Sequence, residues 1–219
     1  ITFTVTDDPT VAQLKTLSDR TSAANITVNG SITDDLYNFI DSGDNSSNTT
    51  NFAAALSHTT NEPIVLNAYT VTSNNNITAI NALLAAAEAG VTGTITDNNG
   101  SEVLNTAVDL TTTSDDTITV DVGTLDPSSD NLAELKKLAD QAGISRINGN
   151  MTISAADIDT ISAYGNLTTS NNYINFTLDN SVSVSQAATL AGKTSGTVAY
   201  DQGISDSISA FASASARTN

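Results

Sequence analysis

The sequence contains no cysteine, and this absence excludes disulfides, thiol catalysis and cysteine-based metal sites. Tryptophan is also absent, and the only histidine is His58. A single histidine without cysteine cannot form a zinc site of the usual composition. No G-x-S-x-G motif supplies a serine for His58 to activate. We therefore expect a surface or capping role for His58.

Positive charge is scarce. The chain has 7 Lys and Arg against 24 Asp and Glu, which gives a net charge of −17. A nucleic-acid backbone would be repelled, so we expect no nucleic-acid partner. Adsorption to an anionic membrane is disfavoured for the same reason. The charge favours solubility, and the alternative is a surface adapted to salt or divalent cations.

Long apolar runs and phosphate-binding loops are also lacking. No segment approaches the length of a transmembrane helix. The chain begins at Ile1 and shows no signal peptide, so we expect a mature chain or a piece of a longer one. Gly192-Lys193-Thr194 matches only the end of a P-loop, and we interpret it as a helix C-terminus. Aromatic residues make up 5% of the chain, so the core must consist of Ile, Leu, Val and Ala.

The stretch from residue 150 to 163 predicts a short strand followed directly by a helix. Its first residues, N-M-T-I, alternate polar and apolar side chains as a half-buried strand does. Ser154 is a suitable N-cap, and Asp157 stands at the third position of a capping box. Ile158 and Ile161 then mark one helix face.

This strand–helix pattern recurs eight times. The strands start roughly 22 to 38 residues apart, about 28 on average, which is within the range of solenoid repeats. The expected strands are Phe3–Val5, Ile26–Val28, Ile64–Leu66, Thr94–Thr96, Ile118–Val120, Met151–Ile153, Phe176–Leu178 and Val198–Tyr200. Alternating strands and helices favour parallel strands joined by right-handed connections. We predict an α/β repeat solenoid of about eight strand–helix repeats, with a mainly parallel sheet in sequence order.

The simplest domain organisation is a single elongated α/β repeat domain over residues 1–219. If the chain is subdivided, we expect the division near residues 98–130, where polar stretches interrupt the pattern. The helix faces are expected to form one continuous core from Leu14, Leu17, Leu36, Ile40, Ile80, Leu83, Leu135, Leu138, Ile158 and Ile161.

Acidic clusters are the only candidates for a metal site. Calcium takes six to eight oxygen ligands, which loop carboxylates and carbonyls can supply. The candidate ligands are Asp115, Asp116, Asp121, Asp126 and Asp130, although no EF-hand motif is present. The alternative is that acidic residues in this chain favour helix N-termini. A paired-carboxylate glycosidase would need a sugar-binding cleft, which usually offers aromatic platforms, and the chain has no Trp and only 5 Tyr. We therefore predict no catalytic residue and no cofactor other than calcium.

Two predicted helix segments are similar to segments of a known group of proteins, namely T-V-A-Q-L-K-T-L at 10–17 and S-A-A-D-I-D-T-I at 154–161. Alternating with short Thr-rich strands, they resemble the repeat arrays of very large surface proteins of marine bacteria, notably cyanobacteria. Similar repeats occur in structural proteins of their phages. The resemblance covers most of the chain as a pattern of composition and period, and the irregular spacing leaves the repeat number open. It implies an extracellular or virion structural role.

We therefore expect a non-enzymatic structural or adhesive repeat module of an extracellular cell-surface or filament-forming protein. The alternative is a virion structural protein of a marine phage, such as a fibre, tail or capsid-decoration protein. The expected partner is another copy or a neighbouring repeat, which pairs with the edge strand at residues 1–5. The alternative is that a loop or the C-terminal helix folds back over this edge. A contact with a cell surface or a host receptor is a further expectation.

Overall fold

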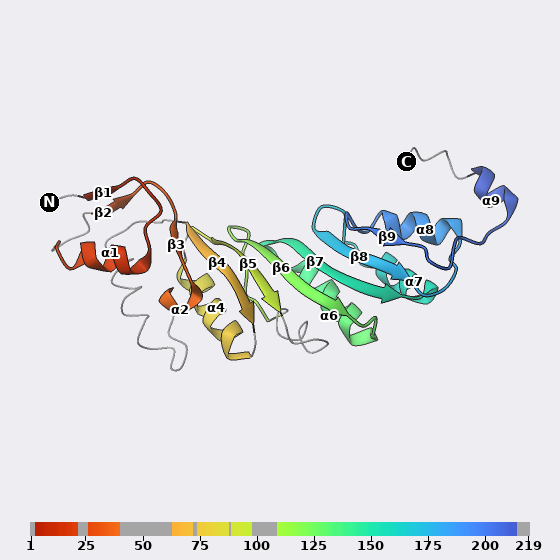
Figure 1. Cartoon of the computed structure of the whole chain (residues 1–219), viewed down its shortest axis with the longest axis horizontal. Helices are drawn as coiled ribbons and strands as arrows, with labels where there is room; N and C mark the ends of the chain where they lie inside the picture. The colour runs from red at the N-terminus through yellow and green to blue at the C-terminus, as the bar shows by residue number, and fades with distance from the viewer. Residues whose placement is uncertain are drawn as a thin grey trace. The chain divides into compact units, whose positions relative to one another are not determined.

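A computed structural model of the chain describes residues 3–21, 26–39, 63–71, 74–87, 89–97 and 109–213, and Figure 1 labels their elements. The strands and helices in chain order are β1 (Phe3–Val5), α1 (Val11–Ser18), β2 (Ile26–Val28), β3 (Ile32–Asp34), α2 (Leu36–Phe39), β4 (Ile64–Val71), α4 (Asn74–Ala86), β5 (Val91–Asp97), β6 (Thr117–Leu125), α6 (Ser129–Asp140), β7 (Ile144–Ile153), α7 (Ala155–Ser162), β8 (Asn172–Leu178), α8 (Val184–Ala191), β9 (Val198–Ala199) and α9 (Ile208–Ser213). The protein is therefore of the α/β class. The predictions for Ile40 and His58 lie outside the described residues.

Strands β3 to β9 form an open parallel sheet in which each strand lies beside the next strand in the sequence. The parallel register pairs residues 32–34 with 64–66, and residues 147–153 with 172–178. This arrangement confirms the predicted parallel sheet in sequence order. Strands β6 and β8 bury alternate side chains along most of their length, because one of their faces packs against helices and the other faces solvent.

The structure differs from the prediction at the second repeat. Residues 26–34 form two strands instead of one strand and a helix start, and β2 pairs with β1 in a separate two-stranded parallel sheet. Asp8 holds the turn between β2 and β3, because its Oδ1 accepts the backbone N–H of Ser31 at 2.8 Å. At Gly30 an added Cβ would lie 2.3 Å from the same Oδ1, so a larger residue there would displace the Asp8 carboxylate from Ser31.

Residues 150–163 contain the predicted strand end, N-cap and helix. Strand β7 ends at Ile153, and α7 begins directly after Ser154. The Asp157 carboxylate accepts the backbone N–H of Ser154 at 2.7 Å and its hydroxyl at 2.8 Å. The predicted helix face is also correct, since Ile158 and Ile161 are buried.

The contacts of the chain divide it into two compact units. The described part of the first unit comprises residues up to 97 together with 109–120 and 141–144, and the second comprises 121–140 and 145–213. Most of the predicted core residues are buried in their own unit, namely Leu14, Leu36, Ile80, Leu83, Leu135, Leu138, Ile158 and Ile161. Leu17 is only half-buried. The single elongated domain stays a prediction.

The C-terminal segment leaves three large apolar side chains exposed. Ile204, Ile208 and Phe211 are spaced three or four residues apart, and α9 forms at 208–213. Their side chains are 39%, 89% and 48% exposed. Among the described residues, no element covers them.

Candidate functional site

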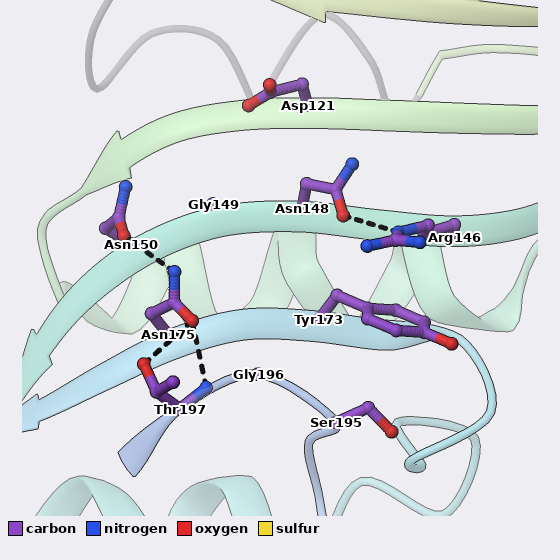
Figure 2. A pocket seen from close by; sticks show the side chains of 10 residues that line it. All are labelled: Asp121, Arg146, Asn148, Gly149, Asn150, Tyr173, Asn175, Ser195, Gly196 and Thr197. Atoms are coloured by element: carbon purple, nitrogen blue, oxygen red, sulfur yellow. Dashed lines mark hydrogen bonds between the residues drawn. The ribbon is translucent and has the colours of Figure 1, made fainter. Parts of the chain in front are cut away.

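A polar groove of about 430 Å³ lies over the solvent-facing side of β6, β7 and β8 in the second unit (Figure 2). Its lining residues are Asp121, Arg146, Asn148, Gly149, Asn150, Tyr173, Asn175, Ser195, Gly196 and Thr197. Strand alternation accounts for this surface. In β7 the buried positions include Ile147 and Met151, so the intervening positions present polar side chains to solvent.

A ladder of amide side chains crosses the groove (Figure 2). Asn150 and Asn175 are directly opposite in the parallel register, and the Asn175 amide donates to the Asn150 carbonyl oxygen at 3.0 Å. The carbonyl oxygen of Asn175 in turn accepts the backbone N–H and the hydroxyl of Thr197, both at 2.9 Å. These bonds fix the orientation of each amide along the sheet.

Arg146 and Tyr173 form the other end of the groove. The guanidinium carbon of Arg146 lies 3.7 Å from the centre of the Tyr173 ring, in a cation–π contact. The Nε of Arg146 donates to Asn148 Oδ1 at 2.7 Å. The terminal nitrogens of Arg146 make no hydrogen bond with a described residue, so they are available to an acidic or polar ligand.

The groove is equipped to bind a ligand and lacks the groups that would activate one. It holds one cation, Arg146, and one carboxylate, Asp121, whose Oδ1 accepts the Gly123 N–H at 3.0 Å. Its serine, Ser195, donates to the carbonyl oxygen of Thr169 at 2.7 Å. No histidine or lysine stands beside that hydroxyl among the lining residues. Hydrogen bonding to a small polar ligand is the chemistry that this arrangement supports.

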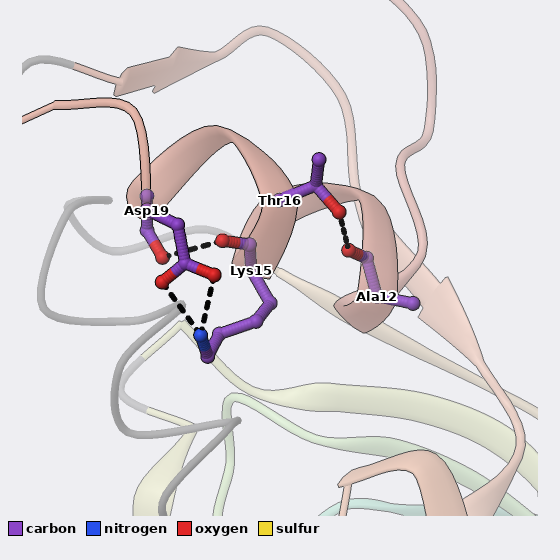
Figure 3. A network of polar contacts seen from close by, with 5 residues as sticks. Ala12, Lys15, Thr16 and Asp19 are labelled. Carbon is purple, nitrogen blue, oxygen red and sulfur yellow. Dashed lines mark hydrogen bonds and ion pairs between the residues drawn. The ribbon is translucent and has the colours of Figure 1, made fainter.

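A second groove, of about 370 Å³, lies beside α1 in the first unit. It is lined by Val5, Asp7, Pro9, Gln13, Thr16, Leu17 and Arg20. Helix α1 forms one side of this groove, and Figure 3 shows the polar contacts along it. Lys15 pairs with Asp19 at 2.6 Å, and the Thr16 hydroxyl donates to the carbonyl oxygen of Ala12 at 2.9 Å. The Asp7 carboxylate has no hydrogen-bond partner among the described residues.

Two of the predicted calcium ligands, Asp115 and Asp116, lie in the loop before β6. Asp116 is buried, and its two carboxylate oxygens accept the backbone N–H groups of Val91 and Thr113, each at 2.7 Å. This side chain therefore joins the loop to the start of β5. Asp115 is exposed, and its backbone carbonyl lies against Gly90, whose φ of 85° only glycine adopts readily.

The other three predicted ligands do not converge. Asp121 lies in the polar groove, and Asp130 is an exposed residue in the first turn of α6. Asp126 is exposed, and its backbone carbonyl accepts the Asn131 amide at 3.0 Å. Within the described ranges, no three acidic or histidine side chains come together as a cation site. Calcium binding stays a prediction.

The shifted pKa of Tyr69 also arises from a contact within the fold. Burial and a hydrogen bond to Tyr37 raise the pKa of Tyr69, and the two hydroxyls are 2.6 Å apart. The rings meet edge to face, with centroids 5.6 Å apart. A raised tyrosine pKa keeps the hydroxyl protonated at neutral pH, so this pair supplies hydrogen bonds and no general base.

One hydrogen bond recurs between a helix N-terminus and a later part of the chain. The first N–H of the helix donates to an Asp or Asn side chain, which is the last residue of β3 or lies after β8 or β9. The three described examples are Val11 to Asp34 at 3.0 Å, Ala155 to Asn180 at 2.9 Å and Val184 to Asp206 at 3.1 Å. The partners are 23, 25 and 22 residues apart. Each bond satisfies a donor that the helix itself leaves unpaired.

The comparisons with protein-family models, curated proteins and solved structures each returned no match. No helix in the described part of the chain has both the length and the apolar character needed to cross a bilayer.

Proposed function

We propose that this chain is a non-enzymatic structural and adhesive repeat module of an extracellular cell-surface or filament-forming protein. Its strand–helix repeats stack as an α/β solenoid of about eight repeats. The observation that carries the proposal is the recurring bond between a helix N-terminus and an Asx side chain of the following repeat. A bond repeated at nearly constant separation is the kind of nearest-neighbour interface that stabilises a repeat array.

The polar groove supports the adhesive part of the proposal. Its amide ladder and the Arg146–Tyr173 pair lie on the face of the sheet that the helices leave open. Such a surface presents fixed donors and acceptors to a polar partner without any change in the fold. The net charge of −17 favours solubility in an aqueous, extracellular setting.

Surface labelling of intact cells that express the gene tests this function. Antibodies against residues 109–213 should label the outer surface in immunogold micrographs. External protease should remove the epitope while leaving a cytoplasmic marker protein intact. Recovery of the chain only from the soluble interior of lysed cells would contradict the proposal. Its presence in purified phage particles would replace it with the virion alternative.

A further inference from the structure

Two blocks of the chain share one pattern. The N-terminal block comprises residues 3–39 and the C-terminal block comprises residues 176–211. The first begins F-T-V-T-D-D-P-T-V-A-Q and the second F-T-L-D-N-S-V-S-V-S-Q. The first ends I-T-D-D-L-Y-N-F and the second I-S-D-S-I-S-A-F. Both first helices start with a capping box, at Thr10 with Gln13 and at Ser183 with Gln186.

Equivalent positions in the blocks make the same hydrogen bonds. Asp34 Oδ2 accepts the first helical N–H of α1, and its Oδ1 accepts the next backbone N–H at 2.9 Å. Asp206 Oδ2 accepts the first helical N–H of α8, and its Oδ1 accepts the next backbone N–H at 2.7 Å. The backbone N–H of Thr33 donates to the carbonyl oxygen of Pro9, and the backbone N–H of Ser205 likewise donates to that of Val182. The two blocks therefore have the same local structure.

The blocks differ in what covers their downstream side. In the N-terminal block, Ile32, Leu36 and Phe39 are fully buried, because β4 pairs with β3 and α4 packs against α2. The equivalent residues of the C-terminal block are Ile204, Ile208 and Phe211, which are 39%, 89% and 48% exposed. Among the described residues, nothing takes the place of β4 and α4 there. The N-terminal block therefore indicates the neighbour that can cover the C-terminal block, namely a parallel strand followed by a helix.

The upstream side shows the opposite difference. In the C-terminal block, β7 pairs with β8 and α7 packs against α8, and Phe176 and Leu178 are each 1% exposed. The equivalent residues Phe3 and Val5 are only half-buried, and within the described ranges β1 pairs with β2 alone. Gln13 and Arg20 line the groove beside α1. Their equivalents Gln186 and Lys193 donate to the carbonyl oxygens of Ala155 and Tyr164, in and just after α7, so the groove corresponds to the side that α7 occupies.

From this complementarity we infer that the C-terminal block of one copy binds the N-terminal block of a second copy, head to tail. The segment at residues 204–206, in which Ile204 forms an isolated parallel bridge with Val182, pairs in parallel with β1 of the next copy, and α9 packs into the groove beside α1. The Asp7 carboxylate then accepts the Ile208 N–H, as Asn180 accepts the Ala155 N–H within one chain. This assembly rests on the proposed structural function and names its partner. Because the two surfaces differ, each bound copy leaves one surface of either kind open, and the contact can extend into a filament or close into a ring of several copies.

Sedimentation velocity on the full chain tests this assembly with two complementary variants. Phe211→Asp disables the C-terminal surface, and Leu17→Asp disables the groove beside α1. The wild type should form a concentration-dependent series of oligomers, and each variant alone should remain monomeric, with association weakened by about 30-fold or more. A 1:1 mixture of the variants should form dimers and nothing larger, because it contains one intact pair of surfaces.

Controls separate loss of the surface from loss of the fold. Ile208→Ser alters a side chain that is 89% exposed, so it should abolish association without lowering the melting temperature. Thr160→Asp, on the exposed side of α7, should associate like the wild type. A wild type that stays monomeric at all concentrations would overturn the inference, as would unaltered association of Ile208→Ser. Neither result bears on the surface labelling, so the proposed function would stand or fall separately.

Discussion

The side chain of Asp34 joins three segments of the first unit. Its buried carboxylate accepts hydrogen bonds from the N–H groups of Val11 and Asp35, and from the Asn38 amide at 2.6 Å. Asp34→Ala leaves buried donors without partners, and should reduce the free energy of unfolding by about 1–3 kcal/mol. Urea denaturation followed by circular dichroism measures this change.

The matched control is Asp206→Ala, because Asp206 makes the equivalent bonds at an exposed position. Water can replace the lost acceptor there, so the expected loss is less than about 1 kcal/mol. Equal losses at Asp34 and Asp206 would show that burial does not determine the contribution of this side chain.

Asp140 provides a test of charge at the end of α6. Its hydrogen bond to Lys136, with a second bond to Asn166, lowers the pKa of its carboxyl below the ordinary value of 3.8. Because the pKa is depressed in the folded state, the ionised form contributes stability above pH 3.8, and this is lost as pH falls through the folded-state pKa. Lys136→Gln should therefore raise the titration midpoint of Asp140, measured by NMR of the carboxyl carbon.

Lys137→Gln is the control for that titration, since Lys137 pairs with Glu134 and not with Asp140. It should leave the midpoint of Asp140 unchanged. A midpoint that responds equally to both substitutions would indicate general charge effects in place of the specific pair.

Helix α7 shows what packing contributes at the scale of an element. Ile158 lies on its buried face with 1% of its surface exposed. Ile158→Ala should reduce the free energy of unfolding by about 2–5 kcal/mol, because it removes buried methyl groups and leaves a cavity. Thr160→Ala on the exposed side of the same helix should change it by no more than about 0.5 kcal/mol. Thermal and urea unfolding of both variants provide the comparison.

Elements with both a cap and an apolar period could be predicted from the sequence. Helix α7 has the Ser154 cap followed by two spaced isoleucines, and α6 has leucines at 132, 135 and 138. Strand β3 was not predicted, because it follows β2 after only three residues and its position depends on a distant residue, Asp8. The helical spacing of Phe211 does not by itself indicate whether a neighbour covers it.

The polar groove could not be predicted for a different reason. Its residues come from separate strands, and only the register of β7 and β8 brings Asn150 opposite Asn175. Asparagine is common throughout this chain, so the N-G-N at 148–150 has no distinct meaning by itself. The available signal was its pairing with N-Y-I-N at 172–175, which requires the strand alignment to be known first.

At the scale of the whole molecule, the net charge of −17 should make stability depend on salt. Raising NaCl from about 20 mM to about 0.5 M shortens the Debye length from about 20 Å to about 4 Å, which weakens repulsion between the acidic residues. The melting temperature should therefore rise with NaCl, as calorimetry can measure. A fall or no change would show that this repulsion is not a significant cost.

The same experiment tests the calcium prediction when CaCl₂ replaces NaCl at equal ionic strength. Specific binding predicts a further rise in melting temperature that Asp121→Asn or Asp126→Asn reduces. Equal melting temperatures in the two salts would contradict a calcium site at these residues.

The hydrogen bond that links the N-termini of α1, α7 and α8 to a later Asp or Asn also bears on how such a gene can change. Because its partners are only 22 to 25 residues apart, each complete strand–helix repeat of the proposed solenoid would carry the acceptor for the repeat before it. Unequal recombination that gains or loses one whole repeat, about 25 codons, would bring a new donor and acceptor together and leave the remaining junctions intact. The fragments I-T-D-D-L-Y-N-F and I-S-D-S-I-S-A-F, alike in sequence and bonding, are what such copying would leave behind. Length in proteins built this way is then a heritable variable that can drift without any loss of folding.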